Sequence, residues 1–221
     1  MLEFIIENRE ILKFFYTFAI AVICAAIVIK TDRFFNLSFH QGIRYLRNAF
    51  LFYGIGFVIR GLVELPFLPY KFLNVLFEFS LITAGFFLLY SLLWKKIEPH
   101  PKEHESSLFN IRITVFYSLA LVIALFDSLW QTYAFMFFSQ IALYISASII
   151  SFQNYQNKGK QHKFLKFYFI AMILSLVAWT SNAIAALVFH WNQLTVIGVY
   201  VMNLIIFLLF LYGIINVTRS K

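Results

Sequence analysis

Seven long apolar runs, separated by short polar segments, constrain the fold of this chain more than any other feature. They lie at about residues 10–30, 43–65, 71–94, 111–130, 132–153, 164–190 and 194–217. Each run has roughly the 20 residues that an α-helix needs to cross the hydrocarbon core of a bilayer. Charged residues make up 13% of the chain, against about 25% in ordinary soluble domains. The sequence therefore predicts an all-α membrane protein in which residues 1–221 form a single seven-helix transmembrane domain.

The positive charges are distributed unevenly among the segments between these runs. Fourteen of the 18 lysines and arginines fall in the first, third and fifth loops, at the helix ends beside those loops, or in the C-terminal tail, all on one predicted side. Cytoplasmic loops of membrane proteins collect Lys and Arg. We therefore expect a multi-pass protein of the cell membrane, embedded in the lipid bilayer with its N-terminus outside and its C-terminus inside. The basic residues follow no groove-reading motif, so no nucleic-acid partner is expected.

The order of landmarks in the first half of the chain returns in the second half. Phe14-Phe15 lies in the first helix as Phe137-Phe138 lies in the fifth, and Tyr45-Leu46-Arg47 precedes a long helix as Phe164-Leu165-Lys166 does. Helix 111–130 would then link two parallel three-helix units. This pattern predicts a 3+1+3 pseudo-repeat, an arrangement found in repeat-built transporters.

Charged residues flank the turn between the second and third runs, where Pro66 and Pro69 interrupt the helical pattern. Folding the chain back at Pro69 sets Arg60 opposite Glu78, with Glu64 close to the turn. Ionisable groups inside a membrane are costly, tend to pair and often mark a functional site. We therefore expect an ion pair between Arg60 and Glu78 below the outer membrane surface.

Other polar side chains fall in the outer half of the expected bundle and come from different helices. Converging polar groups of this kind would form an outward-facing pocket for a small polar ligand or a proton. The predicted ligand-binding or proton-sensing residues are Arg60, Glu64, Glu78, Asp127, Asn182 and Asn203.

Structural roles for the same residues remain alternatives. Arg60 could pair with Glu64 or Glu78 only to fix helix packing, and Asp127 could be a solvated turn residue. Asn182 and Asn203 could form interhelical hydrogen bonds.

The sequence gives little support for an enzymatic function. All five histidines lie in loops or at helix ends, so neither a metal site nor haem ligation across helices is expected. The chain has no glycine-rich phosphate loop, and its last helix has no lysine for a retinal Schiff base. We therefore expect a protein that is not an enzyme and that holds no cofactor and no metal.

The run Thr31–Gly54, and most strongly Gly42-Ile43-Arg44-Tyr45-Leu46-Arg47-Asn48-Ala49-Phe50, resembles part of a known class of membrane sensor. It is similar to the first loop and second helix of the seven-helix sensory regions that precede histidine kinases in some archaea and bacteria. The resemblance implies a sensory input module. The chain departs from that class because it carries no kinase domain, so a signal would pass to a separate cytoplasmic partner.

The 3+1+3 layout is also similar to that of the PQ-loop and SWEET-type transporters, although no Pro-Gln pair occurs in the first or fifth helix. The leading prediction is a non-enzymatic membrane sensor or receptor-like module. The alternatives are a small-solute transporter and a structural subunit of a membrane complex.

Overall fold

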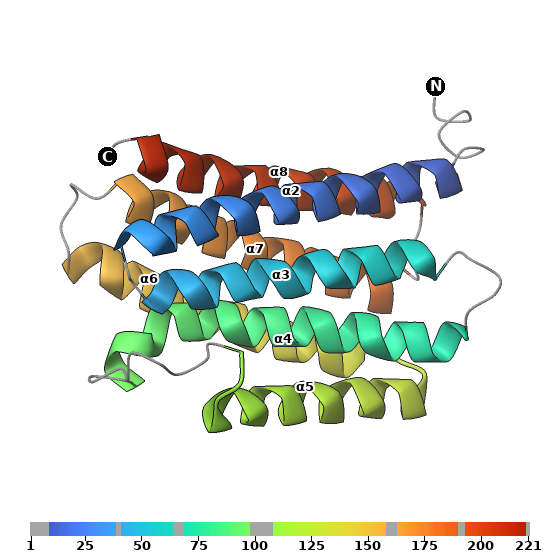
Figure 1. The fold of residues 1–221 in the computed structure, drawn as a ribbon. Helices are drawn as coiled ribbons and strands as arrows, with labels where there is room; N and C mark the ends of the chain where they lie inside the picture. Colours follow the sequence, from blue (N-terminus) through green and yellow to red (C-terminus); the bar gives the residue numbers. More distant parts are fainter. Residues whose placement is uncertain are drawn as a thin grey trace.

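Seven α-helices account for most of the residues that the structure describes (Figure 1). The computed structural model describes residues 9–38, 41–63, 69–97, 108–157, 163–189 and 193–219. One helix corresponds to each predicted segment, and no strand occurs in these ranges. The helices are α2 (Arg9–Ser38), α3 (Gln41–Leu62), α4 (Tyr70–Ile97), α5 (Ile111–Trp130), α6 (Ala134–Asn157), α7 (Lys163–Leu187) and α8 (Gln193–Arg219).

The largest difference from the predicted boundaries is at the end of α2. The sequence predicts an end near residue 30, where polar residues begin, but the helix continues to Ser38. The first two of these polar residues, Thr31 and Asp32, both have partners. The Thr31 hydroxyl donates to the Ile27 and Val28 carbonyls, and Asp32 pairs with Arg47 of α3.

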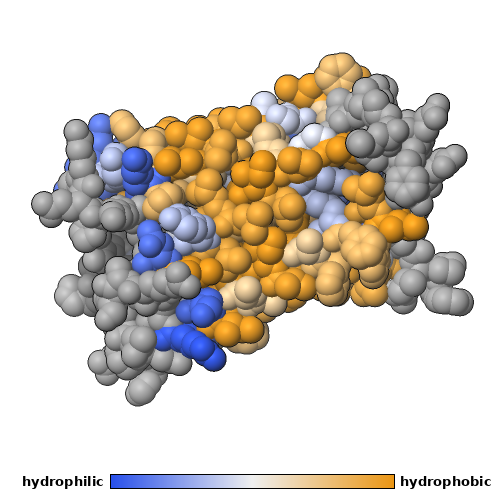
Figure 2. All heavy atoms as spheres, turned by 90° about the horizontal axis from the view of Figure 1, so that it is seen from above, coloured by the Kyte–Doolittle hydropathy of each residue, from blue (hydrophilic) through white to orange (hydrophobic). Residues whose placement is uncertain are grey.

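Six of the described helices are long and apolar enough to cross a membrane, so the chain is a multi-pass membrane protein. The exception is α3, which carries Arg44, Arg47 and Arg60. An apolar band covers the middle of the molecular surface in Figure 2, and hydrophilic residues of this face gather toward one end. This distribution is the one that a bilayer requires of a protein crossing it.

Six helices form a closed ring, in which each packs against its two neighbours. The order around the ring is α2, α3, α4, α6, α7, α8 and back to α2. Helix α5 lies outside the ring, against α4 and α6, and Figure 1 shows it at the edge of the bundle. The ring creates a central space that side chains from six helices can reach.

Burial differs sharply between α4 and α5. In its most apolar stretch α4 has 56% of its residues buried, whereas α5 has 22%. Ala84, Phe87 and Leu88 of α4 are almost completely inaccessible, whereas Leu129 of α5 is 78% exposed. Helix α4 therefore belongs to the core, and the outward face of α5 is suited to lipid.

Candidate functional site: a central cavity

A cavity of about 370 Å³ lies inside the helix ring. All six ring helices contribute to its wall, together with Tyr133 between α5 and α6. This volume is within the range of small-ligand sites, which are typically about 300–1,000 Å³. The described polar and charged lining residues are Lys13, Tyr16, Thr17, Tyr53, Arg60, Tyr70, Tyr133, Tyr144, Ser175, Trp179, Asn182, Tyr200 and Asn203.

The cavity extends along the bundle and changes in character with depth. On α3 its wall runs from Arg60 to Phe50, a distance of about 15 Å at 1.5 Å per residue. Lys13, Arg60 and Tyr70 line it near the end where α3 finishes and α4 begins. Deeper in, aromatic rings make up most of the wall. A ligand would therefore meet positive charge at one end and apolar surface along most of its length.

A hydrogen-bonded aromatic cluster lines the inner part of the cavity. The hydroxyls of Tyr53 and Tyr144 lie 2.5 Å apart, and both side chains are at most 4% exposed. The Tyr144 ring stacks on that of Trp179 with a centroid distance of 6.5 Å. These partners lie on α3, α6 and α7, so the cluster connects three helices across the ring.

Arg60 lines the cavity but does not form the predicted ion pair with Glu78. Its guanidinium carbon lies 5.3 Å from the centre of the Phe77 ring, a cation–π contact. Between Arg60 and Glu78, both of which the structure describes, no N–O distance is within 4 Å. Successive residues of an α-helix are rotated by about 100°. Because Phe77 faces Arg60, its neighbour Glu78 points elsewhere.

Glu78 is buried away from the cavity wall. Its side chain is 3% exposed, and its Oε2 atom has no hydrogen-bond partner among the described residues. The charged groups that act on it electrostatically are Asp127 and Arg60. Glu64, the other predicted carboxylate of this turn, lies outside the described residues.

Asp127 is a buried structural residue, so the alternative of a solvated turn residue is wrong. Its side chain is 1% exposed. The carboxylate accepts hydrogen bonds from the Thr132 hydroxyl at 3.0 Å and from the Phe135 and Met136 amides at 3.0 and 2.6 Å. Both amides belong to the first turn of α6, whose N–H groups have no partner within the helix. Asp127 therefore fixes the turn between α5 and α6 and does not line the cavity.

The two predicted asparagines both lie on the cavity wall. The Asn203 amide donates to the Tyr16 hydroxyl at 3.0 Å, and the Tyr16 ring stacks on Tyr200 with a centroid distance of 4.0 Å. Asn182 is 8% exposed, and its side chain forms no hydrogen bond with any described residue. Asn203 therefore contributes to helix packing, whereas the Asn182 amide is available to a ligand.

The sequence analysis missed the aromatic part of the wall. No phenylalanine is among its predicted site residues, yet Phe50 and Phe207 are buried against the cavity. Tyrosines in the middle of an apolar run were the available signal, because Tyr usually concentrates at the membrane interfaces. Tyr53 and Tyr144 are both such residues.

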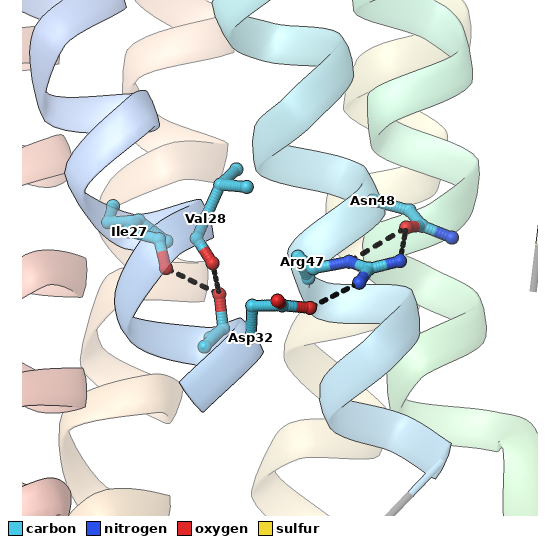
Figure 3. Close-up of polar contacts among 6 residues, drawn as sticks. Ile27, Val28, Asp32, Arg47 and Asn48 are labelled. Atoms are coloured by element: carbon cyan, nitrogen blue, oxygen red, sulfur yellow. Dashed lines mark hydrogen bonds and ion pairs between the residues drawn. The ribbon is translucent and has the colours of Figure 1, made fainter. Parts of the chain in front are cut away.

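A second polar contact lies near the opposite end of α3 (Figure 3). Arg47 Nη1 is 2.5 Å from Asp32 Oδ1, while its Nε and Nη2 atoms are 3.4 and 3.2 Å from Asn48 Oδ1. The pair joins α2 to α3. These side chains do not line the cavity, so the contact serves packing.

No group of three or more His, Cys, Asp or Glu side chains that could hold a metal occurs in the described ranges. The five histidines all lie outside those ranges. The expected absence of a metal site therefore stays a prediction.

Comparison with known proteins identifies a distant relative and no family. The chain is 24% identical over 220 residues to an uncharacterized protein of Archaeoglobus fulgidus, which covers 91% of this chain and 90% of the relative. No protein-family model and no solved structure matches the sequence. The resemblance of residues 31–54 to kinase-linked sensory regions, and that of the layout to PQ-loop transporters, thus remain predictions. What the comparison identifies is a chain of similar length in an archaeon.

Proposed function

We propose that this chain is a non-enzymatic membrane sensor or receptor-like module whose small ligand binds in the central cavity. The observation that carries the proposal is a space of about 370 Å³ surrounded by six helices and lined by aromatic rings and polar groups. Small-molecule sites generally have this size and composition. A ligand that contacts several helices can favour one packing of those helices over another, and so shift their equilibrium.

Three of the six predicted site residues directly support the proposed ligand-binding function. Arg60, Asn182 and Asn203 lie on the cavity wall and come from α3, α7 and α8. Glu78 supplies a second input in the proposal, as a proton-binding group. Its carboxylate is buried within a membrane-spanning helix and has an oxygen without a partner in the described part of the chain. Such intramembrane carboxylates commonly serve proton-linked functions.

We propose that all seven helices span the membrane, with the N-terminus outside and the C-terminus in the cytoplasm. Helix α3 is the least apolar, but it lies between α2 and α4 and its Arg47 is paired with Asp32. Partnered charges are tolerated in a membrane-spanning helix. In this orientation the Arg60 end of the cavity faces outward, and a change in packing reaches the cytoplasmic ends, where a separate signalling protein would read it.

Sensing can be tested with the full chain in nanodiscs, with spin labels on the cytoplasmic ends of α3 and α7. Label distances are measured in the parent, Arg60→Ala and Glu78→Gln during a pH step and during addition of a panel of polar metabolites. We expect at least one stimulus to shift the parent distances and at least one variant to lose that shift. Lys71→Ala is the control, because Lys71 is exposed at the same end and is absent from the described cavity wall. Retention of every response in both variants would refute the proposal.

A small-solute transporter is the second candidate, and the ring order favours it specifically. The units α2–α4 and α6–α8 meet along two equivalent seams, α4 with α6 and α8 with α2, while α5 lies outside as a linker. This is the arrangement expected of a 3+1+3 pseudo-repeat. Transporters of this kind move one repeat against the other around a central site. Uptake of metabolites into proteoliposomes would establish transport, whereas binding without uptake would favour the sensor.

The third candidate, a structural subunit of a membrane complex, predicts a constant partner. Mild detergent extraction from native membranes followed by mass spectrometry would identify such a partner at fixed stoichiometry. A chain that purifies alone and still responds to ligand would exclude this role.

A further inference from the structure

The charge on the cavity wall is one-sided. Arg60 lines the cavity, and no carboxylate is among its described lining residues. Two carboxylates at this end of the bundle could have balanced that charge, but neither lines the cavity. Asp127 holds the start of α6 through three hydrogen bonds, and Glu78 is buried off the wall. The cavity therefore offers a favourable place for negative charge near its Arg60 end.

Arg60 is arranged so that its guanidinium can accept an anion. It lies beside the Phe77 ring, and its N–H donors form no ion pair with any described carboxylate. A guanidinium presents five N–H donors in a geometry that matches a carboxylate in a bidentate pair. The Asn182 amide, 8% exposed and without a described partner, adds hydrogen-bonding capacity to the same wall.

The deeper part of the cavity wall determines which kind of apolar group the ligand can carry. Rings from α3, α6, α7 and α8 surround the space, among them Phe50, Tyr53, Tyr144, Trp179 and Phe207. The hydroxyls of Tyr53 and Tyr144 bond to each other, so this region does not require a polar group from the ligand. Aromatic rings pack favourably edge to face or offset against such walls.

We propose that the cavity binds an aromatic carboxylate, with its carboxylate at Arg60 and its ring among the aromatic side chains. This inference rests on the proposed ligand-binding function and adds to it the chemical class of the ligand. A charged pair that forms inside a membrane protein, away from bulk water, is stronger than the same pair at an exposed surface. Loss of the Arg60 charge should therefore reduce affinity markedly.

The test uses the full chain in phosphatidylcholine nanodiscs and equilibrium dialysis, with empty nanodiscs to subtract partitioning into lipid. The probes are 2-naphthoate, the neutral 2-naphthamide, the cationic 2-naphthylmethylamine and the aliphatic anion decanoate. We expect saturable binding of 2-naphthoate, with an affinity at least about tenfold above that of the other three probes, a difference of about 1.4 kcal/mol.

Variants then locate the interaction. Arg60→Gln should weaken 2-naphthoate binding by about tenfold or more, while binding of 2-naphthamide changes little. Arg60→Lys should lose less, because it keeps the charge, and the exposed Lys71→Gln should leave binding unchanged. Trp179→Ala should weaken 2-naphthoate and 2-naphthamide alike, because it removes part of the wall that holds the ring.

Several outcomes would overturn the inference. Equal or tighter binding of 2-naphthamide or 2-naphthylmethylamine would reject anion selectivity while leaving a ligand-binding cavity, so the proposed function would survive. Tighter binding of decanoate would reject the aromatic assignment in favour of a fatty anion. If the Arg60→Gln variant bound 2-naphthoate with unchanged affinity, Arg60 would not be the partner of the ligand's carboxylate. Absence of saturable binding of all four probes would reject the ligand class, and the spin-label experiment would then decide the proposed function independently.

Discussion

Two arginines of the same helix show how differently one residue type is used at the two ends of this bundle. Arg47 of α3 forms an ion pair with Asp32 and two hydrogen bonds with Asn48. Arg60, about 20 Å further along the same helix at 1.5 Å per residue, has an aromatic ring and a cavity beside it. The comparison teaches that a charge in a membrane bundle is structural where it is partnered, and available to a ligand where it faces a cavity.

Two buried carboxylates repeat this contrast. Asp127 accepts three hydrogen bonds, two of them from backbone amides at the start of α6. Glu78 has an oxygen without a partner in the described part of the chain, although it is as deeply buried. Replacing Arg47 or Asp127 should therefore lower stability. Replacing Arg60 should instead weaken ligand binding, and replacing Glu78 should change the response to protons.

The largest loss of stability is expected for Asp127→Ala. It leaves two backbone amides and the Thr132 hydroxyl without their acceptor, and hydrogen bonds to a charged group each contribute about 1.5–3 kcal/mol. We expect the free energy of unfolding to fall by about 3 kcal/mol, measured by SDS titration in mixed micelles. Thr132→Ala removes one of the three bonds and should cost about 1.5 kcal/mol. Equal losses in the two variants would show that Asp127 does not organise the turn.

The next effect separates the two arginines. Arg47→Ala removes a partly exposed ion pair and two hydrogen bonds, so unfolding should become easier by about 1.5 kcal/mol. Arg60→Ala removes a cation–π contact, for which about 0.5 kcal/mol is expected. Binding of 2-naphthoate should show the opposite order, with the larger loss in Arg60→Ala. Greater destabilisation by Arg60→Ala than by Arg47→Ala would make Arg60 a packing residue.

A smaller difference should separate the two asparagines of the cavity wall. Asn203→Leu removes the hydrogen bond to Tyr16, and such bonds in membrane bundles average about 0.6 kcal/mol. Asn182→Leu breaks no hydrogen bond with a described residue and should leave the free energy of unfolding unchanged or slightly raised. The same SDS titration compares them. Destabilisation by Asn182→Leu equal to that by Asn203→Leu would indicate a structural contact at Asn182.

The positions of the helices could be predicted from the sequence because apolar length alone decides which segments enter a bilayer. The directions in which the side chains point could not be predicted in this way. Counting residues back from Pro69 places Arg60 and Glu78 at similar depth, but a shift of one residue turns a side chain by about 100°. In the structure Phe77 occupies the position opposite Arg60.

The cavity was predicted only in its polar part, for a related reason. Buried and lipid-facing phenylalanines have the same composition, so Phe207 inside the ring and Phe138 outside it look alike in the sequence. Asp127 was recognisable as a turn residue, but its burial depends on how α6 folds back beside α5. The closure of the helix ring, which decides what faces inward, leaves no local pattern.

The sharpest test of the contrast between the carboxylates is a replacement of Glu78, for which only a small effect on stability is expected. Replacement of a buried charged group by an apolar residue of similar size is often neutral or stabilising. We therefore expect Glu78→Met to change the free energy of unfolding by less than about 1 kcal/mol, whereas Asp127→Ala, at the same end of the bundle, lowers it by about 3 kcal/mol.

The change in spin-label distances during a pH step shows whether Glu78 has a proton-binding role or is a buried acid without a function. Glu78→Met and Glu78→Gln cannot lose a proton at this position, so both should abolish the same part of the pH response while the chain stays folded. If Glu78→Met instead lowered the free energy of unfolding by about 2 kcal/mol or more, the carboxylate would have a structural partner. Glu78 would then belong with Asp127 and Arg47 among the residues that hold the bundle together, and the central cavity would be the sole input of the proposed sensor.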